Sequence, residues 1–385
     1  MPLAAAMLKG GGLGGTDMIK SIFLAALAVV TTVSAYGETP VALDLPRASL
    51  EAPWRSRIQS FLDRSVVPVI DLESSLPREE GARYLRDLLP LMDRLGIALI
   101  AFDGYQAPQD GKSSGYRWGY YIHEIAKANP DRFILASNGG TNPNWLQQKG
   151  GAPTDFIDQT EVQIRSEIYP IMGEFDFRHY LSSHQCKTKQ ENRDVDLPLD
   201  GPNGHRLFRL SAETGVAFVI HLEPEDHALA ALEKMLAAYP AAKVIVAHFG
   251  QIRFPEKQRQ FTPDAVRRLL TSYPNLHYDL STGYPGRTYE CNGERRDTVL
   301  WETRGGQQID QLTADYKAIL TDFADRFVAG TDYGGGRPPL SQHFSERIGN
   351  VRLILRDLPP DAQQAIAWGN AWRLLTGRDW TASAP

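Results

Sequence analysis

Short apolar stretches rich in β-branched residues recur along the chain, with starts roughly 30–50 residues apart, the length of a βα unit. They predict eight strands, over residues 66–70, 97–102, 133–136, 171–177, 216–220, 244–247, 276–280 and 327–330. Between them, apolar residues at helical spacing predict helices, for example over 78–95, 228–239 and 263–273. Near-continuous apolar strands are typical of a parallel sheet buried on both faces. The pattern therefore predicts an α/β fold, a (β/α)8 TIM barrel. An open doubly wound sheet is the alternative, but no G-x-G-x-x-G follows a predicted strand.

Two long polar inserts interrupt this alternation, over residues 178–207 after the fourth strand and 281–310 after the seventh. Both leave the C-terminal ends of strands, the face on which barrels carry their active sites. They are interpreted either as lids or substrate walls, or as solvated decoration. Residues 50–380 show neither an internal repeat nor a low-complexity linker. One barrel domain is therefore predicted over residues 37–385.

The N-terminus has the layout of a secretory signal peptide. Lys20 provides a positive charge, residues 22–30 are apolar, and residues 33–35 are small enough for a cleavage site. The apolar stretch is short for a transmembrane helix, although a buried helix or a membrane anchor is the alternative. Residues 1–36 are therefore predicted to be an extension and a signal peptide, and the mature protein to be periplasmic or secreted without membrane attachment.

Composition narrows the classes of function. Of the 385 residues, 42% are hydrophobic and 23% charged, as in an ordinary globular protein. The net charge of −5 argues against a dedicated nucleic-acid binder, so a small-molecule substrate is expected, while a homo-oligomer stays open. The two cysteines, Cys186 and Cys291, are too few for a disulfide-rich scaffold. Export would permit a disulfide between them, and two distant free thiols are the alternative.

Polar side chains stand where five of the predicted strands end. They are Asp71 and Glu73 after the first strand, Glu174 and Asp176 after the fourth, His221 and Glu223 after the fifth, His248 after the sixth, and Asp332 after the eighth. A single histidine at such a position is more often structural than catalytic. Because the C-terminal ends of barrel strands meet on one face, the whole set predicts an active site there.

Four fragments of the chain resemble the amidohydrolase superfamily, in particular the amidohydrolase-related group that includes decarboxylases and hydrolases of carboxylated rings. They are Val-Ile-His-Leu-Glu-Pro around His221, Val-Ala-His-Phe-Gly around His248, Ala-Gly-Thr-Asp-Tyr around Asp332, and Gly-Asn-Ala-Trp-Arg-Leu-Leu at 369–375. The resemblance implies that His221 is a metal ligand. It also implies that His248 binds a second metal or polarises the substrate carbonyl. Asp332 would contact the metal and act as general base.

The first strand departs from that family, which normally ends it with His-x-His. Here Glu73 and Ser75 occupy the two positions. One hypothesis keeps a divalent metal, zinc or manganese, on a ligand set of Glu73, Glu174, His221 and Asp332, because a cation would relieve the repulsion between converging carboxylates. A second uses Glu73, Asp332 and His248 as acid and base without metal. A third is a catalytically inactive barrel that only binds a ligand.

The expected reaction is hydrolysis of an amide, ester or lactone bond in a small molecule. Decarboxylation of a carboxylated aromatic substrate by the same residues is the alternative. Arg178 and Arg253 are candidates for binding an anionic substrate, because a guanidinium matches a carboxylate. Asn138 ends the third strand before a glycine-rich turn and is a further substrate-binding candidate, with a plain turn as the alternative.

Overall fold

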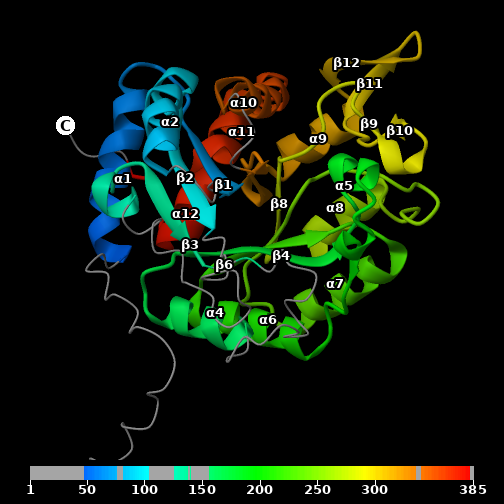
Figure 1. Cartoon of the computed structure of the whole chain (residues 1–385), viewed down its shortest axis with the longest axis horizontal. Coiled ribbons are helices and arrows are strands. Elements are labelled where there is room, and N and C mark those ends of the chain that lie inside the picture. The colour runs from blue at the N-terminus through cyan, green and yellow to red at the C-terminus, as the bar shows by residue number, and fades with distance from the viewer. Residues whose placement is uncertain are drawn as a thin grey trace, which may run out of the picture. The chain divides into compact units, whose positions relative to one another are not determined.

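The computed structural model describes residues 47–75, 81–103, 125–137, 139, 156–334 and 340–381. The predicted signal peptide and Asn138 lie outside these ranges. Within them, a parallel sheet runs β1 (Val69–Ser75), β2 (Ile97–Asp103), β3 (Phe133–Ala136), β4 (Ile171–His179), β6 (Ala217–Leu222), β7 (Val244–Val246) and β8 (Leu276–Asp279) (Figure 1). The segment 327–334 joins its two edges, because β13 (Phe327–Val328) pairs with β8 and β14 (Tyr333–Gly334) pairs with β1. The predicted (β/α)8 barrel is confirmed.

Helices pack around this barrel in chain order. They are α1 (Arg47–Leu62), α2 (Gly81–Leu95), α4 (Phe156–Arg165), α6 (Pro202–Thr214), α7 (Asp226–Ala238), α8 (Pro263–Ser272), α9 (Ala314–Asp322), α10 (Leu340–Arg356), α11 (Pro360–Gln364) and α12 (Asn370–Thr376), with a π-helical turn over Ala365–Gly369. Helix α8 shows how the sequence sets these bounds. Thr262 caps its first turn by accepting a hydrogen bond from Ala265, Pro263 occupies its first position, and Val266, Leu269 and Leu270 bury one face. No helix of the described residues is both long and apolar enough to cross a membrane.

Irregular pairing alters the ends of two strands. Strand β1 begins later than predicted and continues through Ser75. Asp71 pairs with Ile100 of β2 and Ser74 pairs with Phe102, so an advance of three residues along β1 faces an advance of two along β2. Strand β4 shows the same irregularity between Met172 and Phe175, opposite β6. Bulges of this kind re-aim side chains and are common next to active sites. They set the directions of Glu73 and Glu174.

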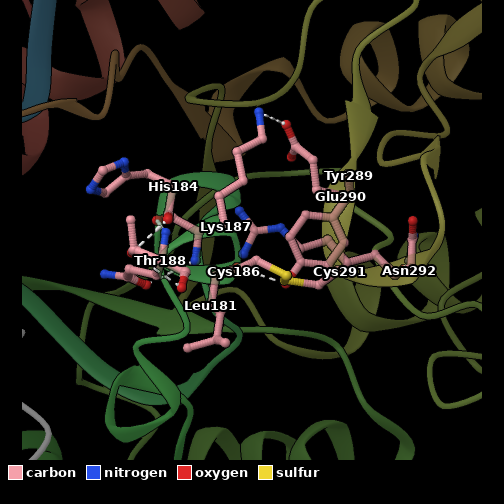
Figure 2. The surroundings of a disulfide bond; sticks show 12 residues. Leu181, His184, Cys186, Lys187, Thr188, Tyr289, Glu290, Cys291 and Asn292 are labelled. Carbon is pink, nitrogen blue, oxygen red and sulfur yellow. Dashed lines mark hydrogen bonds and ion pairs between the residues drawn. A yellow bond between two sulfur atoms is a disulfide. The ribbon is translucent and has the colours of Figure 1, made fainter.

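The two polar inserts fold and are joined to each other. The first carries α5 (Ser183–Lys187), a 3-10 turn (Glu191–Arg193) and β5 (Val195–Asp196), which pairs antiparallel with β4. The second carries the pair β9 (Thr288–Tyr289) and β10 (Arg295–Arg296), the 3-10 turn Glu290–Asn292, and the hairpin β11 (Trp301–Arg304) and β12 (Gln307–Leu312). A disulfide links Cys186 to Cys291 between the inserts, and Lys187 forms an ion pair of 2.7 Å with Glu290 beside it (Figure 2).

The first helix and the last described residues lie together on the barrel. Arg55 of α1 donates a hydrogen bond of 2.8 Å to the carbonyl oxygen of Thr381. Its guanidinium also stacks over the ring of Trp380, 4.5 Å from the centroid. A short 3-10 turn over Ala324–Arg326 precedes β13, and Asn370 at the start of α12 donates to the carbonyl oxygens of Ala324 and Phe327. The C-terminal helices therefore anchor the segment that joins the two edges of the sheet.

Candidate active site and metal-binding groups

Three predicted side chains converge at the C-terminal ends of β4, β6 and β7. Nδ1 of His221 lies 2.9 Å from Oε1 of Glu174 and 3.0 Å from Nε2 of His248. Nε2 of His248 lies 3.4 Å from the same Glu174 oxygen. Both histidines are buried and Glu174 is partly buried. Residues that are 27 and 47 positions apart in sequence thus form one cluster.

A buried ion pair supports this cluster from one side. Glu223 accepts a hydrogen bond of 2.8 Å from Arg253, and its Oε1 lies 3.5 Å from Nε2 of His221. Gln258 donates a further bond to its second oxygen. The side chain of Glu223 is only 2% exposed. Arg253, predicted to bind substrate, instead has Glu223 as its partner in this structure.

These contacts shift the pKa values of His221 and Glu174. Burial disfavours a charged His221, but hydrogen bonds and attraction from Glu174 and Glu223 outweigh it and raise its pKa to about 10. Burial disfavours ionised Glu174 too, yet His221 and His248 hold the pKa of that carboxyl well below its usual range. The arrangement therefore places a positive imidazolium between the carboxylates of Glu174 and Glu223.

His248 is held in one orientation. Its Nδ1 lies 2.9 Å from the carbonyl oxygen of Ser281 and 2.7 Å from the hydroxyl oxygen of the same residue. Its backbone N–H donates to Oδ1 of Asp279, and its φ of 62° is in the left-handed region. A non-glycine residue in that region costs on the order of 1 kcal/mol, which the surrounding bonds offset. Nε2 is thus left facing the cluster.

Glu73 lies beside His248 at the end of β1. Its Oε1 is 3.8 Å from Nε2 of His248, and its side chain is 7% exposed. Neither carboxylate oxygen has a hydrogen-bond partner among the described residues. Burial, together with the charges of Asp279, Glu174 and Asp332, raises the pKa of Glu73 well above its usual range. A cation at this point would remove the cause of that shift.

Asp332 takes a different place from the one its predicted role implies. Its backbone N–H donates to the carbonyl oxygen of Glu73 at 3.0 Å, which brings the residue to the edge of the cluster. Its side chain, however, is 48% exposed and lies 3.8 Å from Arg347. The backbone has a φ of 47°, again in the left-handed region. The structure thus places the Asp332 carboxylate at the rim, where water reaches it.

Arg178 does not join the cluster. Its guanidinium donates to Glu225 at 2.7 Å and to Asp194 at 2.6 Å, and it stacks over the ring of Tyr180. These carboxylates occupy the donors that an anionic substrate would need. The prediction that Arg178 binds substrate therefore gains no support from its surroundings.

Three further residues lie near the cluster, His179, Asp176 and Asp279, and the strand-end pattern had named only Asp176 among them. His179 is partly buried, with its ring centroid 4.4 Å from that of His221. Burial first, and then Glu174, raise the pKa of Asp176 to about 7. Asp279 binds the backbone of His248. Alternation along β4 relates Asp176 to Glu174, two residues away, whereas no residue of the strand-end set lies two residues from Asp279.

Three groups of described side chains could hold a metal ion, with ligand atoms within 4.8 Å of one another. They are Glu174, His221 and His248; Asp176, His179 and His221; and Glu73, His248 and Asp279. The third group fits a cation best by its own structure, because Glu73 and Asp279 leave buried oxygens without hydrogen-bond partners. A Cβ at Gly330 would lie 3.2 Å from Cγ of Asp279, so glycine leaves room for this carboxylate.

Comparisons with known proteins show a family to which part of the chain is similar. No curated protein matches it. Among solved structures it is similar to 2,6-dihydroxybenzoate decarboxylase from Rhizobium, at 13% identity and a TM-score of 0.43 over 80% of this chain and 98% of that one. It is also similar to dihydroorotase from Campylobacter jejuni, at 12% identity and a TM-score of 0.41 over 81% and 84% of the two chains. The sequence model of the family described as amidohydrolase matches residues 185–376. As the strand-end residues indicated, residues 185–376 of this chain match the amidohydrolase family, and His221, His248 and Asp332 lie inside the match.

Proposed function

We propose that this protein is a hydrolase that cleaves an amide, ester or lactone bond of a small molecule at the C-terminal ends of its barrel strands. The observation that carries the proposal is the convergence of Glu174, His221 and His248, with contacts of 2.9 to 3.4 Å between atoms from three strands. The match of residues 185–376 to the amidohydrolase family supports an enzyme of this class. Mutual burial of two imidazoles and a carboxylate is costly unless the charges are used or paired.

His221, His248 and Asp332 each have a separate role in the proposed reaction. His221, charged and fixed by Glu174 and Glu223, binds the polar part of the substrate. His248 polarises the carbonyl through Nε2–H when both of its ring nitrogens carry a proton, and in its neutral form its Nε2 would instead serve as the ligand of a cation. Asp332, exposed at the rim and joined to Glu73 through its backbone, accepts the proton of the attacking water.

A divalent cation fits this end of the barrel, where buried carboxylates and imidazoles accumulate. The sequence predicts Glu73, Glu174, His221 and Asp332 as the ligands. In the structure, Glu73 groups with His248 and Asp279, Glu174 groups with His221 and His248, and Asp332 belongs to neither group. When bound, a zinc or manganese ion would supply Lewis-acid polarisation and lower the pKa of water towards neutrality. The residues of the chain would position the substrate and take up the proton.

The test is a substrate panel of small amides, esters, lactones and carboxylated aromatics, with products identified by mass spectrometry. Addition of one water supports hydrolysis, whereas loss of carbon dioxide would replace the proposal by the decarboxylase alternative. Asp332→Asn should lower kcat by about 100-fold or more while the substrate Kd changes little, because a general base contributes 10²–10⁴-fold. Asp310→Asn, on the exposed hairpin, is the matched control and should retain full activity. Binding without turnover of any compound would leave a ligand-binding barrel.

A further inference from the structure

Glu73 and Asp279 form a pair of buried carboxylates whose charge is not balanced by hydrogen bonds. Their side chains come from β1 and from β8, and they are 7% and 1% exposed. Both oxygens of Glu73 and Oδ2 of Asp279 lack hydrogen-bond partners among the described residues. Nine in ten or more of such buried polar groups are satisfied in folded proteins. Three bare oxygens at one point therefore need an explanation.

The other carboxylates of the cluster differ in this respect. Oε1 of Glu174 lies within 3.4 Å of both His221 and His248. Glu223 receives bonds from Arg253 and Gln258. Each of these side chains already has a positive or donor partner from the protein itself. Both oxygens of Glu73 and Oδ2 of Asp279 lack a hydrogen-bond donor among the described residues, so a ligand of positive charge is expected at this pair.

The surroundings of Asp279 hold its bare oxygen in place. Oδ1 accepts three hydrogen bonds, from the backbone of His248 at 2.9 Å, from the backbone of Ser281 at 2.9 Å and from the Ser281 hydroxyl at 2.5 Å. Oδ2 accepts none. Glycine at position 330 leaves the space next to this oxygen clear, since a Cβ there would lie 3.3 Å from it. In metal sites, a ligating carboxylate is commonly held by hydrogen bonds to the oxygen that does not bind the metal. Asp279 has this arrangement, with Oδ1 hydrogen-bonded and Oδ2 available to a cation.

His248 completes the group. The carbonyl oxygen of Ser281 can only accept, so the proton of a neutral His248 lies on Nδ1. Nε2 then presents a lone pair on the side of Glu73, 3.8 Å from its Oε1. Ligating histidines commonly donate their other N–H to a backbone carbonyl in this way.

We propose that one divalent cation binds between Glu73, Asp279 and His248, and that Asp332, which lies between β13 and β14, is not a ligand. Two carboxylates and one imidazole suit manganese. The ligands then come from β1, β7 and β8, and the aspartate of β8 takes the place that the family resemblance gives to Asp332. This inference deepens the proposed function, because it names the ligands of the cation, and it is tested by binding alone.

The competing explanation is a proton shared between Glu73 and Asp279, which would relieve the same repulsion without a metal. The two explanations differ in what Mn²⁺ does. A shared proton predicts no saturable binding at pH 7. A cation site predicts one equivalent and a rise in thermal stability with Mn²⁺ concentration.

The experiment is titration of the full, metal-stripped chain with MnCl2, followed by the electron paramagnetic resonance of free Mn²⁺ and by thermal unfolding. The wild type should bind one equivalent. Asp279→Asn and Glu73→Gln should each weaken binding by about tenfold or more, and both keep the shape of the side chain so that circular dichroism can verify folding. Asp332→Asn is the matched control and should stay within about twofold of the wild type.

Two results would overturn the inference. One is the absence of saturable Mn²⁺ binding by the folded wild type. The other is loss of binding in Asp332→Asn with retention in Asp279→Asn, which would return the metal to the ligand set implied by the resemblance. Because no substrate enters the measurement, an inactive protein that binds Mn²⁺ through Asp279 would refute the proposed function and keep this inference. Turnover of a substrate without Mn²⁺ binding would refute this inference and keep the proposed function.

Discussion

The buried pair of Glu223 and Arg253 allows a prediction that separates stability from substrate binding. Arg253→Met removes the guanidinium and keeps much of the side-chain volume, so that Glu223, which is 2% exposed, loses its partner at 2.8 Å. Breaking a buried ion pair from one side costs about 3–5 kcal/mol. Gln258 and His221 still contact the carboxylate, so we expect the lower end, about 3 kcal/mol.

Urea unfolding at pH 7, followed by circular dichroism, measures this cost. Adding Glu223→Gln to Arg253→Met should recover about 2 kcal/mol, because no charge is then left buried without a partner. Arg165→Met is the control. Its ion pair with Glu213 at 2.6 Å is half-exposed, and its loss should cost at most about 1 kcal/mol. If Arg253→Met unfolds like the wild type while KM for an anionic substrate rises, the reasoning is refuted and Arg253 is a substrate-binding residue.

Three further predictions concern other parts of the barrel. Replacing Cys186 and Cys291 together by serine should lower the free energy of unfolding by about 2–5 kcal/mol in denaturant melts, since the bond closes a separation of 105 residues; an unchanged midpoint would contradict this. Burial raises the pKa of Asp71 to about 6 despite its hydrogen bonds. Protonated Asp71 therefore makes its full contribution to the free energy of unfolding below about pH 4, and this contribution is lost as the pH rises through 6. Asp71→Asn does not titrate and should therefore gain about 3 kcal/mol relative to the wild type between pH 4 and 7 in metal-free urea melts, and a constant difference would be evidence against it. Gly330→Ala should cost about 1–3 kcal/mol and weaken Mn²⁺ binding, because the new Cβ presses on Asp279; equal Mn²⁺ affinity would count against the position of the cation.

The barrel could be predicted because its strands are apolar over most of their length. The strand over Phe133–Ala136 and the start of the strand at Ile97 were predicted at their observed positions. The end of β1 could not be predicted from apolar residues. Asp71, Glu73 and Ser74 are polar and still lie in the strand, where buried groups of the protein take the place of water around them, as in the hydrogen bond from Ser74 to Asp71. A bulge also moves these residues out of strict alternation between the two faces of the sheet.

The site could be predicted only as a set of residues at strand ends. Their order along the chain placed Glu174, His221 and His248 on one barrel face, and the structure brings their side chains together. Sequence could not show that Glu223 is buried, because its partner Arg253 lies 30 residues later in a separate loop. It also could not show which way Asp332 points, since a left-handed backbone conformation at a non-glycine residue has no clear sequence signature.

The contact of α1 with the last described residues means that the order of elements along the chain can be rearranged. Arg55, which holds Thr381, lies about 12 Å along α1 from residue 47, a span that a flexible linker of about ten residues covers. New ends could be opened between Gly305 and Gly306, an exposed turn where nothing approaches within 4 Å of an added Cβ. In such a circular permutant, the segment carrying β13 and β14 would precede β1 in the chain as it already adjoins β1 in the sheet. A permuted protein that keeps its ligand affinities would demonstrate that the ring of strands, and not the position of the chain ends, assembles the site.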